Sequence, residues 1–314
     1  MERQSYLIEA EREYRQIAEL LKLKRTHKLG LDAFIAFHRD FPDFDPDHLV
    51  EKYSVNGFSA HTVNLAVPRE SRDQTDFTLP LLEWCPVPTG LVELLDQDEA
   101  GQRRVRRVEV AAFQISKYPI TNKQYQTFID DPQGYMNPVW WQFAPQAQDW
   151  HMNNPAPKTP RFKGDERPRE TINWYEAGAF CQWLSSRTGS TVRLPTTAEW
   201  QRACQGDDSR HYPWGNTFDQ ENCNTAESNL KMTTLVTRYT HGVSPYGVYD
   251  LAGNVWEWCL DGPPIADNQT HEGKKYFVRG GSHISPYQRA HAAFRYTLAP
   301  EIYHSSIGFR VVRV

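Results

Sequence analysis

Residues 245–258 read PYGVYDLAGNVWEW, and this stretch is the best guide to the fold of the chain. Gly253 and Asn254 are turn-forming residues, and Asp250 and Glu257 place one carboxylate on each side of the turn. Carboxylate and backbone carbonyl oxygens are the ligands that Ca²⁺ prefers in proteins. A turn held only by hydrogen bonds and packed Trp side chains is the other interpretation, and the sequence leaves both open.

Further distinctive segments lie on both sides of this stretch. Upstream are YPITNKQYQTFI at 118–129, INWYEAGAFCQWL at 172–184, RLPTTAEWQRAC at 193–204 and YPWGN at 212–216. Downstream are FVRGGSHISPYQRAHAAFRY at 277–296 and SSIGFRVV at 305–312. In this order, the segments resemble the formylglycine-generating enzyme (sulfatase-modifying factor) family over roughly residues 80–314.

The resemblance implies an α+β fold, namely a C-type-lectin-like (formylglycine-generating-enzyme-like) irregular domain with short helices and antiparallel strands. It also implies a structural calcium site, in which the glycine and the valine contribute backbone carbonyls, with ligands from Asp250, Gly253, Val255 and Glu257. A second family calcium site would lie near Asn224 and Thr225, but its acidic partner is not recognisable here.

The resemblance also predicts which chemistry is missing. Oxidase members of the family hold copper through two cysteines of the GGS segment, and counting from Ser282 these positions are Ser285 and Ala290. Cu(I) requires thiolate or thioether ligands, which a hydroxyl and a methyl group cannot replace. We therefore expect no copper and no enzymatic activity. A copper-dependent formylglycine-generating oxidase-like enzyme with displaced ligands is the alternative from another class.

The segment between GGS and IGFRVV mixes aromatic, histidine and small polar side chains without helical or strand periodicity, which is typical of a binding surface. A protein or peptide is the expected ligand. The predicted ligand-binding residues are His283, Ile284, Ser285, Tyr287, His291, Phe294, Tyr296, Leu298, Tyr303, His304 and Ser305, with Trp140 and Trp141 as rim contributors from the long loop.

Residues 280–314 also resemble the C-terminal variable region of the diversity-generating-retroelement variable proteins, which share the lectin-like scaffold and end in the same IGFRVV sequence. Those systems mutate adenines in AAY codons, and each predicted C-terminal ligand-binding residue is encodable by such a changed codon. Diversified binding and binding of one fixed specificity both remain open.

Two catalytic alternatives have less support. A three-histidine zinc site from His283, His291 and His304 is chemically possible, but no carboxylate or supporting motif accompanies these histidines. Ser282 is not in a G-x-S-x-G context, and no Gly-rich phosphate loop is present in the sequence.

The composition and net charge narrow the class of protein further. With 314 residues and 39% hydrophobic content, the chain can fill one large core and carry an appendage. A net charge of −4 argues against a nucleic-acid partner. No apolar run reaches the length of a signal peptide or membrane span, so a cytoplasmic location is expected. The five cysteines lack C-x-x-C spacing and are predicted to be buried.

The predicted organisation is a helical N-terminal appendage, a linker or extended arm, and the C-type-lectin-like domain, over residues 1–63, 64–79 and 80–314. Apolar residues recur every three or four positions near the N-terminus, which indicates amphipathic helix. These helices are candidates for a protein partner. A sensor subunit of a defence or signalling system, in which they recruit an effector, is a further alternative.

Within the domain, helices are predicted after Thr121, over the NWYEAGAFCQWLSSRT segment ended by Gly189, and after Thr196 or Thr197. Residues 134–169 are rich in Pro, Asn and Trp and are predicted to form a structured surface loop. Phe309 and Val311 are predicted to face the core.

Overall fold

The computed structural model describes Tyr14, Ala18 and residues 79–97, 103–263 and 273–314. The chain divides into two units, Met1–Asp73 and Gln74–Val314. In the first unit Tyr14 and Ala18 are helical, and Tyr14 is buried. The rest of the predicted N-terminal helices, and residues 64–78 of the predicted arm, lie outside the described residues.

The predicted helices of the second unit are confirmed, and their ends follow from local chemistry. Three of them begin with a capping box, in which Thr121, Asn173 or Thr196 accepts a backbone N–H and the third helical residue reciprocates. Gly189 ends the longest helix in the left-handed conformation (φ 66°). The helices are α4 (Asn122–Asp130), α5 (Pro145–Asn153), α6 (Trp174–Thr188) and α7 (Thr197–Gln205), and the 3₁₀ helices are η1 (Pro138–Trp141), η2 (Gln220–Asn222), η3 (Ala226–Ser228) and η4 (Tyr287–Ala290).

Helix α5 was not predicted, because it lies in the segment interpreted as a surface loop. Its N-cap residue, Ala144, makes no side-chain capping hydrogen bond, although Pro145 favours the first helical turn. The helix is held instead by packing, since Ala147 and His151 are both buried.

Short strands form three small sheets. The first has the order β1-β4-β10-β5, the second is the hairpin β2-β3, and the third has the order β8-β7-β6-β9. All pairs are antiparallel except β6 with β9. The strands are β1 (Trp84–Val87), β2 (Gly90–Gln97), β3 (Arg103–Val110), β4 (Phe113–Ser116), β5 (Val192–Arg193), β6 (Trp256–Trp258), β7 (Tyr276–Arg279), β8 (Arg295–Leu298), β9 (Ile307–Gly308) and β10 (Val312–Arg313).

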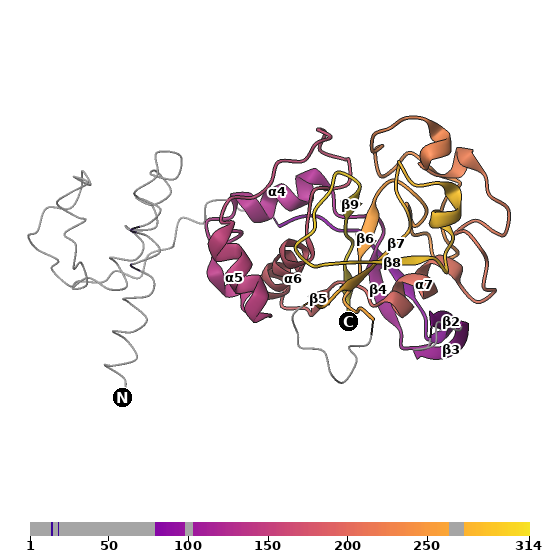
Figure 1. Cartoon of the computed structure of the whole chain (residues 1–314), viewed down its shortest axis with the longest axis horizontal. Coiled ribbons are helices and arrows are strands. Elements are labelled where there is room, and N and C mark those ends of the chain that lie inside the picture. Colours follow the sequence, from indigo (N-terminus) through magenta and orange to yellow (C-terminus); the bar gives the residue numbers. More distant parts are fainter. Residues whose placement is uncertain (1–13, 15–17, 19–78, 98–102, 264–272) are drawn as a thin grey trace, which may run out of the picture. The chain divides into compact units, whose positions relative to one another are not determined.

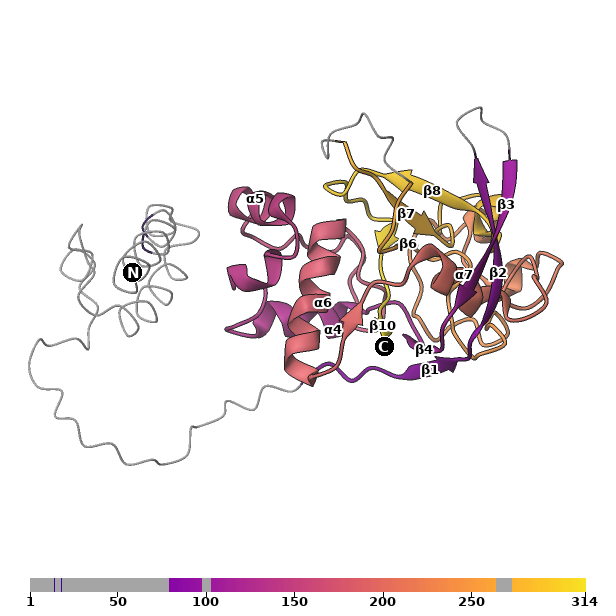
Figure 2. The ribbon, with the colours of Figure 1, turned by 90° about the horizontal axis from the view of Figure 1, so that it is seen from below.

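The second unit is organised along one direction. Helices α4, α5 and α6 gather at one end, the β2–β3 hairpin lies at the other, and strands β6, β7 and β8 lie between them (Figure 1, Figure 2). Strand β10 pairs with both β4 and β5, so the C-terminal residues are fixed to the beginning of the domain. The segment from β7 to β10, which includes η4, β8 and β9, is therefore anchored at both ends.

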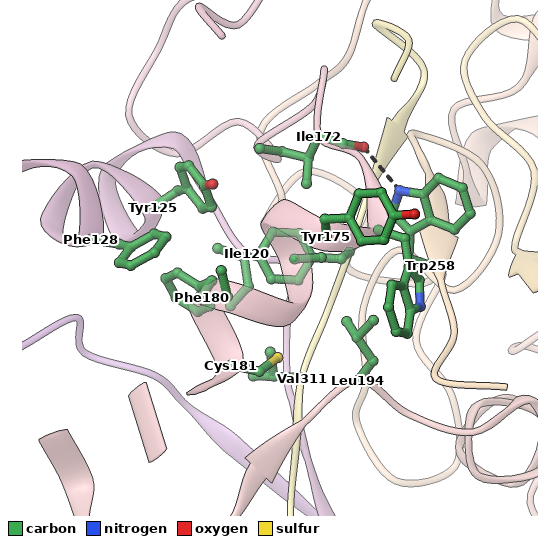
Figure 3. Packing of buried hydrophobic residues seen from close by; sticks show 14 of the residues in the cluster. Ile120, Tyr125, Phe128, Ile172, Tyr175, Phe180, Cys181, Leu194, Trp258 and Val311 are labelled. Atoms are coloured by element: carbon green, nitrogen blue, oxygen red, sulfur yellow. Dashed lines mark hydrogen bonds between the residues drawn. The ribbon is translucent and has the colours of Figure 1, made fainter. Parts of the chain in front are cut away.

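Two hydrophobic clusters fill the core. In the first, Tyr125 of α4 stacks on Phe180 of α6 with ring centroids 5.6 Å apart, and Trp258 donates a hydrogen bond to the Ile172 carbonyl (2.9 Å; Figure 3). The second lies between the hairpin, α7 and β7 and includes Trp200 and Phe277. The expected burial of Phe309 and Val311 and of most of the cysteines is confirmed, since all five cysteines are buried.

Trp141 is also in the core, so its predicted role at the rim of a binding site is wrong. Its side chain is fully buried, its ring nitrogen donates to the Tyr135 carbonyl (3.1 Å), and its ring stacks on His151 (centroids 4.0 Å apart, 5° between planes). Burial lowers the pKa of His151 from 6.5 to about 4, although a backbone hydrogen bond with Met136 opposes this shift.

The buried imidazole predicts a loss of stability in mild acid. The unfolded chain binds a proton at His151 more readily than the folded chain does, so stability falls as pH falls below the unfolded pKa towards the folded one. Between about pH 7 and pH 5, the titration of His151 alone should lower the free energy of unfolding by about 2 kcal/mol. The His151→Phe variant keeps a stacking ring but cannot titrate. Urea unfolding of both proteins at the two pH values should show a smaller loss in the variant, and equal losses would contradict the assignment.

Candidate functional site

An open groove of about 1200 Å³ lies along the C-terminal segment. Its floor includes Phe277 of β7 and Phe294, and strand β8 contributes its first three residues. The hairpin β2–β3 forms one wall, through Leu95, Asp96 and Arg106. A second wall contains Tyr212 and the beginning of η4, so segments that are far apart in sequence meet around one open space.

The η4 wall is aromatic and packed. Tyr287 lies against Phe218 (centroids 4.7 Å apart), and Phe218 contacts Tyr212 (5.7 Å). Tyr212 in turn stacks on Trp214 (5.3 Å, 10° between planes). Aromatic rings that are already fixed by neighbours provide contact area at low entropic cost, which suits a recognition surface.

The hairpin wall is ionic and fixed to β8. Asp96 of β2 accepts hydrogen bonds from Arg106 (2.6 Å) and from Arg295, and Arg295 also donates to the Leu95 carbonyl (2.8 Å). Burial alone would raise the pKa of Asp96, but the hydrogen bonds from the two guanidinium groups lower it below its ordinary value. The carboxylate therefore stays charged and links the hairpin to the C-terminal segment.

The predicted ligand-binding residues separate into several groups. Four of them line the groove: Tyr287, His291, Phe294 and Tyr296. Tyr296 and Tyr287 are 52% and 37% exposed, so a ligand in the groove can reach both rings. Ile284, Tyr303 and His304 are also exposed, and Ser305 and Trp140 are partly exposed, but none of these five residues lines the groove.

Three predicted residues are held inside the domain instead. His283 is buried, and both its backbone N–H and its Nδ1 lie 3.0 Å from the Asn254 carbonyl. Ser285 is buried, and its hydroxyl is 2.9 Å from the Ser282 hydroxyl. Leu298 is half-buried against the first core cluster. The prediction that these side chains form the contact surface is corrected, because they fix the loops that carry the exposed residues.

His291 connects the groove to a second histidine. Its Nδ1 accepts the Ala293 N–H (3.0 Å), and its ring lies 4.6 Å from that of His211. Burial lowers the pKa of His291, and His211 and Arg279 lower it further. The imidazole is therefore mainly neutral at pH 7 and presents a polar but uncharged surface to the groove.

The two carboxylates of the 245–258 stretch have different partners. Glu257 is fully buried, and its two oxygens accept three hydrogen bonds, from Arg310 (2.6 and 2.8 Å) and from the Trp200 ring (2.6 Å). Asp250 accepts from the Asn254 amide (2.8 Å), and burial raises the pKa of Asp250 to about 7. Arg310 thus neutralises Glu257, one of the two carboxylates in the predicted calcium ligand set of Asp250, Gly253, Val255 and Glu257, and that ligand set stays a prediction.

Among the described residues, no group of three or more His, Cys, Asp or Glu side chains could hold a metal ion, so the three-histidine zinc alternative is not supported. Ser285 and Ala290, the positions expected for the copper cysteines of the family, are both buried and offer no sulfur. Burial raises the pKa of Cys204 and Cys223 to about 12, so these thiols are poor nucleophiles.

Sequence reasoning missed several groove residues. Tyr212, Trp214 and Phe218 were attributed to structural motifs or left unassigned, and the hairpin residues Asp96 and Arg106 were not considered. The aromatic density of residues 212–218 was the available signal for the η4 wall. Nothing local marks the hairpin, because its contribution depends on contacts across roughly 200 residues of chain.

The fold and the groove define an α+β domain of the C-type-lectin-like class, with an open cavity over its C-terminal segment, as expected from the sequence. The chain belongs to the family of sulfatase-modifying factor enzyme 1-like domains, whose profile matches residues 73–314. No helix of the described residues combines the length and apolar character needed to cross a bilayer.

Relatives of this chain differ in activity. It is 29% identical over 253 residues to the inactive C-alpha-formylglycine-generating enzyme 2 of Mus musculus, covering 67% of this chain and 78% of the relative. It is 24% identical over 291 residues to the formylglycine-generating enzyme of Bos taurus, covering 74% of each. It is 31% identical over 180 residues to the hercynine oxygenase of Mycolicibacterium smegmatis, covering 50% of this chain and 39% of the relative. Family membership alone therefore does not decide between an enzyme and an inactive protein.

Solved structures share the fold. Treponema denticola variable protein 1 matches with a TM-score of 0.54 and 20% identity, over 73% of this chain and 94% of that protein. PvdO from Pseudomonas aeruginosa matches with a TM-score of 0.55 and 20% identity, over 76% of this chain and 96% of that protein. At this level of identity the likeness establishes the fold alone.

Proposed function

We propose that this chain is a non-catalytic binding protein that holds a segment of a protein or peptide ligand in the groove along its C-terminal segment. The observation that carries the proposal is that four of the predicted ligand-binding residues, Tyr287, His291, Phe294 and Tyr296, line one open cavity. Exposed tyrosines beside fixed aromatic rings and one charged wall provide both apolar contact and polar specificity.

The chemistry of the family's copper positions supports a role without catalysis. Ser285 and Ala290 cannot ligate Cu(I), and the inactive relative of Mus musculus shows that family members include proteins named as inactive. A copper titration followed by an oxygen-consumption assay with a Cys-containing peptide tests this directly. We expect no turnover above that of free copper, and conversion of the cysteine to an aldehyde would overturn the proposal.

The proposal extends to diversification of the exposed C-terminal residues. The likeness in fold to Treponema denticola variable protein 1 supports this extension. The exposure of Tyr287 and Tyr296 also agrees with it, because substitution of either residue would change the groove without changing the core. Sequencing the neighbouring DNA should reveal a reverse transcriptase and a near-copy of the codons for residues 280–314 that differs at adenines. A locus without both would leave a groove of one fixed specificity.

Alanine substitutions in the groove should weaken binding without unfolding the domain. Random displayed peptides of about 12 residues are selected on the full chain, and dissociation constants of the selected peptides are measured for each variant. Tyr287→Ala and Tyr296→Ala should each raise the dissociation constant about tenfold, the usual effect of truncating a central aromatic residue.

Tyr303→Ala is the matched control for this experiment, because Tyr303 is 40% exposed but does not line the groove. It should leave the affinity of groove-binding peptides within about twofold. Peptides that bind equally well to all three variants, or a selection that yields no binder, would contradict the groove as the binding site.

A further inference from the structure

A second exposed surface lies outside the groove and is rich in positive charge and aromatic rings. The Lys158 ammonium lies 5.0 Å from the centre of the Tyr303 ring, and the Arg161 guanidinium lies 5.6 Å from the centre of the Phe162 ring. Arg161 and His304 are exposed. We call Lys158, Arg161, Phe162, Tyr303 and His304 the cationic corner.

The members of the cationic corner adjoin one another through His283. The Phe162 ring meets the His283 ring edge to face, with centroids 5.3 Å apart. Burial lowers the pKa of His283, a backbone hydrogen bond with Asn254 opposes this, and the charges of His304 and Arg161 lower it further. The Phe162–His283 and Lys158–Tyr303 ring contacts therefore join two segments that are more than 100 residues apart in the sequence.

The positive charge of this surface is not neutralised within the described protein. Within residues 79–97, 103–263 and 273–314, neither Lys158 nor Arg161 forms an ion pair, whereas buried arginines such as Arg310 do. Two buried carboxylates of neighbouring segments already have hydrogen-bond partners. Glu170 accepts from the Phe162 N–H (2.9 Å) and the Thr171 hydroxyl, and Glu176, on which the Lys158 charge also acts, accepts from the Tyr135 hydroxyl (2.9 Å) and the Asn173 N–H (3.1 Å). Cations stacked on rings without a carboxylate partner can bind one from another molecule.

One buried tripeptide fixes the geometry of the cationic corner. Arg169 donates to the Lys158 carbonyl, Glu170 accepts the Phe162 N–H, and the Thr171 N–H donates to the His304 carbonyl (3.1 Å). Arg169 and Glu170 are almost fully buried. Thr171 has a φ of 60°, which is unusual and strained for a β-branched residue. Both loops of the corner are therefore held in place before any ligand binds.

We propose that the cationic corner is a second binding site, separate from the groove, that recognises an acidic peptide segment. The Lys158 and Arg161 charges lie over two different rings. Two separate cations match carboxylates on neighbouring residues of a peptide better than they match one small anion. Exposed Ile284 and Tyr303 add apolar contact that a peptide can use. A nucleic acid is less suitable because the whole chain carries a net charge of −4.

The test uses fluorescein-labelled octaglutamate and the full chain, with binding measured by fluorescence anisotropy. The double variant Lys158→Glu/Arg161→Glu should weaken binding at least about tenfold, because two attractions become repulsions. The matched control is Lys274→Glu, since Lys274 also stacks on a tyrosine (Tyr276, 4.9 Å) but lies elsewhere in the sequence. The control should change affinity less than about twofold.

Two further measurements separate the possible failures. Tyr296→Ala should leave octaglutamate binding unchanged, so a failed groove proposal and a failed corner proposal give different results. The milder Lys158→Gln/Arg161→Gln variant is measured if the charge reversal lowers thermal stability. Unchanged octaglutamate affinity in a folded double variant would overturn the proposal. Equal or tighter corner-dependent binding of a single-stranded oligonucleotide would assign the site to nucleic acid instead.

Discussion

Replacing Arg310 by methionine is expected to lower the free energy of unfolding by about 3–5 kcal/mol, a large part of the stability of an ordinary domain. The Arg310 and Glu257 side chains are both fully buried, and two hydrogen bonds of 2.6 and 2.8 Å join them. Methionine fills much of the same volume but leaves the Glu257 carboxylate buried without its counter-charge. The loss is measured by urea unfolding at neutral pH.

Two comparison variants make the prediction specific to the buried pair. Arg313→Met removes a guanidinium that lies three residues away in the sequence. This guanidinium is only partly buried and donates to the Gln114 side chain, so the substitution should lower the free energy of unfolding by about 1 kcal/mol or less. Adding Glu257→Gln to Arg310→Met removes the unpaired charge and should recover part of the lost stability. A loss for Arg310→Met that is no larger than that for Arg313→Met would contradict the account.

Gly253→Ala is expected to destabilise the domain by about 3 kcal/mol or more, because the new methyl group would meet backbone and not a flexible side chain. Gly253 has a φ of 83°, and an added Cβ would lie 2.3 Å from the Asn224 carbonyl oxygen. That carbonyl accepts the Asn254 N–H (2.7 Å), so it cannot move away without breaking the turn. Thermal and urea unfolding measure the effect.

Gly247→Ala provides the control for this substitution. Gly247 has a similar φ of 77°, but an added Cβ would have no neighbour within 4 Å. Its alanine variant therefore bears only the conformational cost, about 1–2 kcal/mol. The difference between the two variants measures the close approach of the 253 and 224 backbones, and equal losses would show that no such contact exists.

The sequence predicted much of the secondary structure because helix ends depend on residues only a few positions apart. Thr121 and Thr196 each cap a helix with the residue three positions later, and Gly189 ends α6, so these signals are complete within one turn. Helix α5 was missed for the same reason, since it has no capping side chain and depends on the packing of Ala147 and His151.

The sequence predicted which segment carries the candidate site but not how its side chains are arranged. Tyr287 and Tyr296 line the groove as a recognition surface requires, whereas Trp141 is in the core and Ser285 supports a loop. Spacing in sequence does not separate these cases, because the sequence around all four residues has no period that would show which side is buried.

By itself, the sequence indicated the family and the ends of helices α4, α6 and α7, since each depends on the identity of residues at short, fixed spacing. Only the tertiary structure decided that Arg310 neutralises Glu257, that Asp96 of the hairpin meets Arg295, and that the C-terminal loops divide between a groove and a cationic corner. These contacts join residues from 53 to about 200 positions apart. Their partners are chosen by the packing of the whole domain, which no local pattern records.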